Sequence, residues 1–280
     1  MIRPVDAVIE FLTAEQARGT SHILLDKGAK EGLRDLYRRS QTSSKPAALA
    51  PVSTPPAKAS AAIPSHLTIE GSSKAEQLAS LRKQAEAWPA AKALGTLRET
   101  MVFATGNPDA AIMLVGDAPG YEEEKKAEPF VGPAGQKLND ILKAMGLSRD
   151  SVYISNIVKF RPSTPRQTTN NRKPDADEIA VCMPFIRAEI NIVRPACIIA
   201  LGSVAAEGLL GKTNQINTMR SSWHEFEGIP VRVTYHPSYL LRSDANLSVK
   251  RQTWEDMLAV MERLEMPIST KQRAYFLPKS

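Results

Sequence analysis

The sequence predicts an α/β fold in which helices cover both faces of a parallel sheet. Four apolar runs rich in β-branched residues recur along the chain, and segments with helical spacing of apolar residues separate them. Continuous apolar runs are typical of strands that are buried on both faces, as they are in parallel sheets. The predicted strands are AIMLV (111–115), SVYISNIV (151–158), ACIIALG (196–202) and IPVRVTY (229–235).

The predicted helices alternate with these strands. In the segment 134–146, for example, apolar side chains recur at the spacing that places them on one helical face. The other helical segments follow the same pattern or, at the start of the domain, are rich in charged residues. The expected helices cover residues 73–93, 134–146, 175–193, 203–211 and 249–264.

Composition divides the chain into four parts. Residues 1–39 carry short apolar patterns at helical spacing, which predicts a small helical extension. Residues 40–72 are rich in Ser, Ala and Pro and cannot bury enough apolar surface to order themselves, so we expect a flexible linker. The predicted globular domain covers 73–266, and residues 267–280 are expected to form a C-terminal tail.

The overall composition favours a protein that binds a polyanion. The chain has 280 residues, 42% of them hydrophobic, and a formal net charge of +6, which favours nucleic acid as a partner. Its two cysteines, Cys182 and Cys197, can build neither a disulfide framework nor a four-thiolate metal site. No apolar run approaches the roughly 20 residues that cross a bilayer, and the start lacks the apolar core of a secretory signal. We expect a cytoplasmic protein with no membrane contact.

Functional groups in a parallel sheet are expected at the carboxyl ends of the strands. Those ends carry the turn GDAPG (116–120), Asn156, Gly202 with Ser203, and HPS (236–238). Turn geometry alone also explains the Gly and Pro residues of the first segment. The chain has no GxGxxG fingerprint, and no GK[ST] pair directly follows this turn, which argues against a dinucleotide enzyme and a nucleotide hydrolase.

Phe130, Asn156 and His236 each have a structural and a functional interpretation. Phe130 stands among prolines and glycines before a helix, where it either packs in the core or offers its ring to a flipped base. Asn156 is either a satisfied buried amide or a donor and acceptor pair that fits the edge of one pyrimidine. His236 directly follows a strand, where a single histidine is ordinarily structural.

The loop 159–174 concentrates positive charge without any acidic residue. By default it is a solvated loop, but at the active edge of the sheet it could hold DNA phosphates. Its cations are Lys159, Arg161, Arg166, Arg172 and Lys173.

Taken together, the motifs resemble the uracil-DNA glycosylase superfamily and are most similar to family 4. The match covers roughly residues 80–265 and implies a three-layer α/β/α sandwich with a central four-stranded parallel sheet. The motifs occur in the order GDAPGYEEE, EPFVGPAG, SNIVKFRP, PACIIALG, WHEFEGIPV and YHPSYLLR.

The resemblance implies one pocket with two catalytic residues. Asp117 stands where the family's GEAPG motif has Glu, and its shorter carboxylate would position water and balance charge at the sugar. His236 would donate to the uracil O2 as the base leaves, while Phe130 would stack on uracil and Asn156 would bind its edge. The expected substrate-binding residues are Gly116, Ala118, Pro119, Gly120, Phe130 and Asn156.

A DNA surface is expected beside this pocket. The resemblance implies that the segment 238–242 presses into the duplex, that Leu240 or Leu241 fills the vacated stack and that Arg242 meets phosphate. The residues expected to contact DNA are Lys159, Arg161, Arg166, Ser203, Ser238, Leu240, Leu241 and Arg242.

The chain departs from the family at its iron-sulfur site. Family 4 holds a 4Fe-4S cluster with four cysteines, whereas the matching positions here are Pro89, Lys92, Phe160 and Cys182. One thiolate cannot hold a cluster that needs four. We expect no metal and no cofactor, with packing around Trp88 and Phe160 supporting this region instead.

The resulting expectation is a DNA repair glycosylase that releases uracil from single- or double-stranded DNA and leaves an abasic site. Two alternatives stay open: a glycosylase for another deaminated base such as hypoxanthine, and a catalytically weak module that binds DNA or abasic sites. We expect a monomer, and the basic N-terminal extension is a candidate site for a repair or replication partner.

Overall fold

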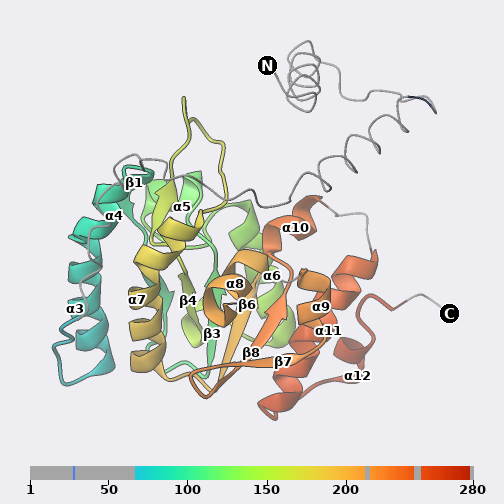
Figure 1. The fold of residues 1–280 in the computed structure, drawn as a ribbon. Coiled ribbons are helices and arrows are strands. Elements are labelled where there is room, and N and C mark those ends of the chain that lie inside the picture. Colours follow the sequence, from blue (N-terminus) through green and yellow to red (C-terminus); the bar gives the residue numbers. More distant parts are fainter. Residues whose placement is uncertain (1–27, 29–66, 212–214, 243–246, 278–280) are drawn as a thin grey trace, which may run out of the picture. The chain divides into compact units, whose positions relative to one another are not determined.

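The chain is described from a computed structural model that covers residue 28 and residues 67–211, 215–242 and 247–277 (Figure 1). It divides into two units, residues 1–59 and residues 60–280, and the sheet and helices named below belong to the second. The predictions for residues 1–39 and for most of the linker 40–72 lie outside the described residues.

A six-stranded sheet with the strand order β2-β4-β3-β6-β8-β7 forms the centre of the domain. Its four inner strands are parallel, whereas β2 and β7 run antiparallel to their neighbours at the two edges. The strands are β2 (Ala104–Gly106), β3 (Ile112–Gly116), β4 (Tyr153–Asn156), β6 (Cys197–Leu201), β7 (Trp223–Phe226) and β8 (Ile229–Thr234), and a separate antiparallel pair joins β1 (Leu97–Met101) to β5 (Phe160–Pro162).

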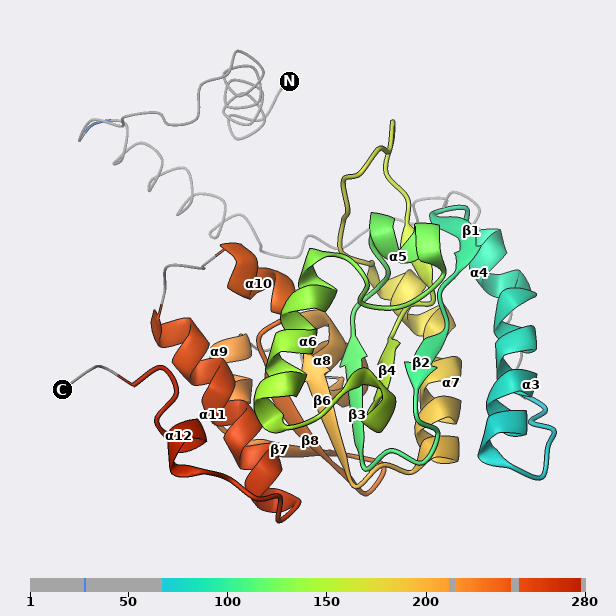
Figure 2. The ribbon, with the colours of Figure 1, turned by 180° about the vertical axis from the view of Figure 1, so that it is seen from behind.

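Helices cover both faces of this sheet. The helices α7 and α8 lie in front of it in Figure 1, with α3 packed outside α7, and α6 and α11 lie in front of it in Figure 2. The prediction of an α/β/α sandwich is therefore confirmed, and the predicted four parallel strands form the centre of a larger sheet that also has two antiparallel edge strands. These helices are α3 (Lys74–Glu86), α6 (Pro133–Met145), α7 (Ala176–Val193), α8 (Ser203–Leu210) and α11 (Leu247–Arg263).

The shorter helices connect these layers. The helix α10 packs on α6, and α9 contacts β8. They are α4 (Pro89–Leu94), α5 (Tyr121–Lys126), η1 (Arg149–Ser151), α9 (Ile216–Arg220), α10 (Pro237–Arg242) and α12 (Thr270–Arg273).

Alternation along the buried strands divides the core into two halves. In β3, Met113 and Val115 belong to the apolar cluster that includes α3 and α7. Ile112 and Leu114 belong to the opposite cluster, formed with α6 and α11. Successive side chains of a strand point to opposite faces, so each inner strand contributes to both halves and must be apolar throughout.

The segment after residue 266, which the sequence suggests is a tail, packs on the domain. The indole of Trp254 donates to the Gln272 carbonyl at 2.6 Å, and the Gln272 amide donates to the Ala144 carbonyl at 2.9 Å. The ring of Tyr275 lies 5.2 Å from that of Trp254. The ordered domain thus extends beyond the predicted boundary, because its partners on α6 and α11 are distant in sequence. No helix in the described ranges is long and apolar enough to span a membrane.

Candidate active site

A cavity of about 500 Å³ opens at the carboxyl ends of the four parallel strands. The loops that follow β3, β4, β6 and β8 supply its walls, as expected for ligand sites in parallel sheets. The residues that line it include Asp117, Ala118, Pro119, Gly120, Phe130, Asn156, Ser203, His236 and Ser238, all of which the sequence singles out.

Gly116 allows two of these side chains to approach the end of β3. It is paired in register with Asn156 on the neighbouring strand. A Cβ atom on Gly116 would overlap both the Asn156 Oδ1 and the ring of Phe130. The Asn156 amide and the Phe130 ring can therefore converge only because this position lacks a side chain.

The amide of Asn156 has an unused acceptor. Its Oδ1 is buried and has no hydrogen-bond partner among the described residues. An unpaired buried acceptor costs on the order of 1–3 kcal/mol. Because the residue lines the cavity, a ligand that brings a hydrogen-bond donor would remove this cost.

Phe130 adopts a strained backbone conformation. Its φ is +55°, in the left-handed region, and its side chain is buried. Such a conformation costs of order 1–3 kcal/mol for a residue other than glycine. The ring centroid lies 5.7 Å from that of His236. The strained backbone of Phe130 thus occurs at the residue whose ring lines the cavity.

Glu123 joins the loops on either side of α5 and is not among the site residues predicted from the sequence. Its Oε1 accepts from the amides of Val131 and Gly132 at 3.0 and 2.8 Å, and its Oε2 accepts from the amide of Gly120 at 3.2 Å. The bond from the Gly120 amide to Glu123 is the half of a capping box that the glutamate supplies, and Gly120 has no side chain to supply the other half.

His236 presents a donor to the cavity because its other nitrogen is occupied. The Ser238 amide donates to Nδ1 at 3.2 Å, and the Ser238 hydroxyl lies 2.7 Å from the same atom. A backbone amide can only donate, so Nδ1 is the acceptor and the ring proton resides on Nε2. Nε2 lies 3.6 Å from the Asp117 Oδ1.

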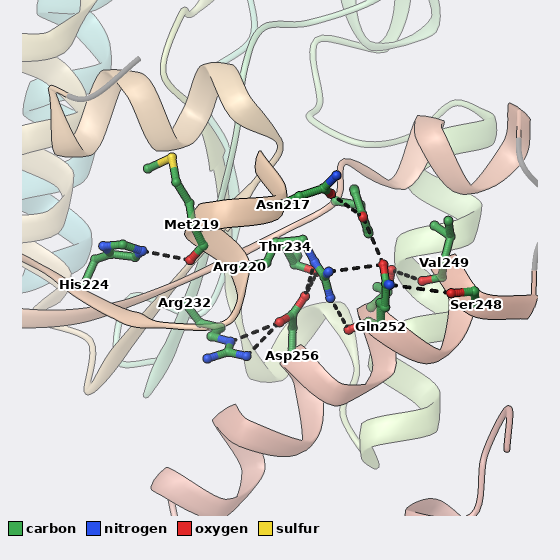
Figure 3. Close-up of polar contacts among 12 residues, drawn as sticks. Asn217, Met219, Arg220, His224, Arg232, Thr234, Ser248, Val249, Gln252 and Asp256 are labelled. Atoms are coloured by element: carbon green, nitrogen blue, oxygen red, sulfur yellow. Dashed lines mark hydrogen bonds and ion pairs between the residues drawn. The ribbon is translucent and has the colours of Figure 1, made fainter. Parts of the chain in front are cut away.

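A polar network that includes Asn217, Arg220 and Asp256 adjoins the cavity (Figure 3). The Tyr235 hydroxyl donates to the Asn217 Oδ1 at 2.6 Å, and both residues line the cavity. The Arg220 guanidinium lies 4.4 Å from the centre of the Tyr235 ring and donates to the Asp256 carboxylate at 2.9 Å. Asn217 lies on α9, a short helix that was not predicted from the sequence.

Two of the cations expected to contact DNA are directed inward instead. Lys159 is fully buried, forms an ion pair with Glu189 and donates to the Ser155 hydroxyl at 2.7 Å. Arg161 is 2% exposed and donates to the Glu124 carboxylate at 2.8 Å. The prediction that these two side chains meet phosphate is wrong, because each is buried against a carboxylate that is distant in sequence.

The rest of the cationic loop borders the cavity. Arg166 is exposed, whereas Arg172 lines the cavity and binds both oxygens of Glu178, at 2.5 and 2.8 Å. Burial would raise the pKa of the Glu178 carboxyl, but the hydrogen bonds from Arg172 and other neighbours hold that pKa below its usual value. Asn171 and Lys173 also line the cavity.

The helix α10 presents Leu241, not Leu240, to solvent. Leu240 is 4% exposed and packs with Tyr235 and Val249, so the prediction that it could enter the duplex is wrong. Leu241 is 40% exposed and Tyr239 is 45% exposed. The prediction for the side chain of Arg242 lies outside the described residues.

Aromatic packing surrounds the region of Trp88 and Phe160, where the sequence predicts packing in place of a metal site. The rings of Trp88 and Phe185 meet edge to face with their centroids 4.7 Å apart, and the Trp88 indole donates to the Val181 carbonyl at 3.0 Å. Phe160 and Cys182 are buried in the same apolar cluster. Burial raises the pKa of the Cys182 thiol to about 11.

Comparison with known sequences identifies the family to which the chain belongs. Residues 103–258 match the family model of the uracil DNA glycosylase superfamily. The Type-4 uracil-DNA glycosylase of Thermotoga maritima is 41% identical over 162 residues, which cover 57% of this chain and 81% of that protein. The Type-4 uracil-DNA glycosylase of Pyrobaculum aerophilum is 35% identical over 156 residues, covering 53% of this chain and 76% of that protein.

Proposed function

This chain belongs to the uracil-DNA glycosylase superfamily, and from that premise we propose that it hydrolyses the N-glycosidic bond of deoxyuridine in DNA. The products are free uracil and an abasic site, as in base excision repair. The observation that carries this proposal is the convergence of Phe130, Asn156 and His236 in one cavity. Together they offer an aromatic face, an unpaired acceptor and a directed N–H donor to a single base.

The reaction separates charge at the glycosidic bond. The bond between C1′ and N1 breaks with its electron pair on uracil, so the sugar becomes positive and the base negative. The Nε2–H of His236 donates to the uracil O2, where negative charge grows. Asp117 stabilises the positive sugar and accepts the proton of the water that adds to C1′. Its carboxylate and His236 are close enough, at 3.6 Å, to act on one nucleotide.

Recognition of uracil is assigned to Asn156. The free Oδ1 accepts from the uracil N3–H, and the amide nitrogen donates to O4. Cytosine carries an acceptor at N3 and an exocyclic amine in place of O4, so it would leave these groups unpaired in a buried site. A site built to hydrogen-bond one edge rejects such an analogue strongly.

DNA is proposed to lie across the mouth of the cavity. Arg166 is exposed in the cationic loop and is suited to a phosphate contact. Ser203 and Ser238 line the cavity and offer hydroxyls to the phosphates beside the flipped nucleotide. Leu241 is exposed on α10 and is suited to fill the vacated stack. Arg242, at the end of the same helix, remains a proposed phosphate ligand.

The experiment that tests the function is an excision assay. Purified protein is incubated with single- and double-stranded oligonucleotides that contain uracil or hypoxanthine, and abasic sites are cleaved with alkali. We expect strand breaks with uracil in both forms of DNA and none with hypoxanthine. Breaks with hypoxanthine alone would favour a different deaminated base, and binding without any breaks would favour a catalytically inactive DNA-binding module.

We also propose that the protein acts without an iron-sulfur cluster. The donors at the corresponding positions do not fit a cluster, since Pro89, Lys92 and Phe160 offer no thiolate. Cys182 is buried in the same apolar cluster as Phe160, and burial raises its thiol pKa, which opposes ionisation. The edge-to-face contact of Trp88 and Phe185 supplies packing there instead.

This proposal predicts an inert pair of thiols. Burial raises the pKa of the Cys182 thiol to about 11 and that of the Cys197 thiol to about 12, so neither should react with a disulfide reagent at neutral pH until the protein is unfolded. Treatment with iron and sulfide should leave no visible absorption of an iron-sulfur cluster. Rapid thiol reaction in the folded protein, or a visible band that persists after desalting, would contradict the proposal.

A monomer in the cytoplasm is the proposed working form. Gel filtration at several protein concentrations checks the first point. The N-terminal extension remains the proposed site for a repair or replication partner. It lies almost entirely outside the described residues.

A further inference from the structure

Arg149 lies outside the cavity and binds the loop that carries Phe130. Its Nη2 donates to the Pro129 carbonyl at 2.7 Å, and its Nη1 donates to the Phe130 carbonyl at 3.0 Å. The Nη2 also donates to the Glu128 carboxylate at 2.9 Å. Arg149 is not among the residues that line the cavity. Its guanidinium therefore acts on the backbone of the loop and not on a ligand.

The two carbonyls that Arg149 binds flank the φ and ψ angles of Phe130. In extended backbone, successive peptide units face opposite sides, so their carbonyls diverge. In a helical conformation of either hand they point the same way. The planar fork of a guanidinium offers several donors on one side. Here one guanidinium binds both carbonyls, and φ of Phe130 is +55°, in the left-handed region.

We propose that Arg149 is a positioning residue that fixes the left-handed backbone of Phe130 and thereby aims its ring into the cavity. This inference rests on the proposed function, in which that ring stacks on uracil. Glu123 binds the amides that follow Phe130, whereas Arg149 binds the carbonyls of Pro129 and Phe130. Without Arg149, the carbonyls of Pro129 and Phe130 are no longer held on one side by a single guanidinium, and we expect the backbone of Phe130 to leave the strained left-handed region.

The helix α6 approaches the loop that carries Phe130 closely and leaves its backbone little room to move. A Cβ atom on Gly135 would overlap the Phe130 carbonyl. The helix can therefore approach this carbonyl only because residue 135 has no side chain. Arg149, which lies on η1 and has a side chain that is 22% exposed, reaches the same carbonyl. The loop is therefore held between the helix and the guanidinium. We expect a side chain at position 135, or loss of the Arg149 guanidinium, to displace the Phe130 ring.

The test compares Arg149→Gln with a matched arginine that is remote from the cavity. Arg251 has the same arrangement, because it donates to the Glu255 carboxylate and to the carbonyls of Arg273 and Tyr275. Its side chain is 20% exposed. We expect Arg149→Gln to lower kcat/KM for uracil excision about 10- to 100-fold, since small displacements of a positioned group have effects of this size. Arg251→Gln should leave kcat/KM within about twofold of the wild-type value.

A double-mutant cycle separates positioning from a general structural effect. If Arg149 acts through the ring, Arg149→Gln should have little further effect on excision when Phe130→Ala is already present. Arg149→Lys should restore activity only partly, because an ammonium lacks the planar fork. The inference would be overturned if the effects of Arg149→Gln and Phe130→Ala on kcat/KM multiply in the double variant. It would also be overturned if Arg149→Gln lowers kcat/KM no more than Arg251→Gln does.

A crystal structure of Arg149→Gln gives a readout that does not depend on excision. The inference predicts that φ of Phe130 leaves the left-handed region, and retention of φ near the present value would overturn it. If the wild-type protein releases no uracil, the proposed function fails, while the φ angle still decides whether Arg149 fixes this backbone.

Discussion

Replacing His236 by alanine is expected to lower the rate constant of uracil release about 100- to 1,000-fold, which is the typical effect of removing one preorganised donor. The reason is that the Ser238 amide, by donating to Nδ1, directs the Nε2–H into the cavity. Single-turnover release of uracil from a labelled oligonucleotide, with enzyme in excess, measures the chemical step directly.

His224→Ala is the control for this variant. His224 is also half-buried and also uses one ring nitrogen in a backbone contact, 2.8 Å from the Met219 carbonyl. It does not line the cavity, so its replacement should leave the rate constant nearly unchanged. A wild-type rate in His236→Ala, at unchanged DNA binding, would remove His236 from the proposed mechanism.

Replacing Asp256 by alanine is expected to lower the free energy of unfolding by about 3–5 kcal/mol, because it leaves two buried guanidinium groups without their counter-charge. Asp256 is 1% exposed and accepts from Arg220 at 2.9 Å, from Arg232 at 2.8 Å and from the Thr234 hydroxyl at 2.8 Å (Figure 3). Burial raises the pKa of this carboxyl while the two guanidinium groups oppose that rise. Urea unfolding measures the change.

Glu262→Ala provides the comparison on the same helix. Glu262 forms an ion pair with Arg273, but both side chains are more than half exposed. An exposed pair contributes about 0–1 kcal/mol, so this variant should unfold close to the wild-type urea concentration. Equal destabilisation by the two variants would show that burial of Asp256 does not set the size of the effect.

The parallel sheet could be predicted because its signal is local. Each inner strand is buried on both faces, so the apolar runs are continuous and the carboxyl ends can be read directly from the sequence. The same rule located Asn156 and His236 near one another. The edge strands β2 and β7 could not be found in this way, because they are short and only partly buried.

The errors concern side chains whose partners are distant in the sequence. Lys159 and Arg161 stand in a stretch without acids, which favoured a solvated surface, yet Glu189 and Glu124 reach them from other helices. Leu240 and Leu241 are adjacent and equally apolar, and only the packing of α10 separates the buried one from the exposed one. Local charge and hydrophobicity do not contain this information.

The antiparallel edge strands also bear on how the protein resists aggregation. A sheet normally grows when another chain pairs with the free backbone groups of an edge strand. Here β2 is three residues long and β7 is four, and β7 carries Glu225 on its exposed surface. Very short edges and charged side chains both disfavour such pairing. The apolar parallel strands, which would be the most adhesive part of the fold, are thus separated from neighbouring molecules by two strands that offer little to extend.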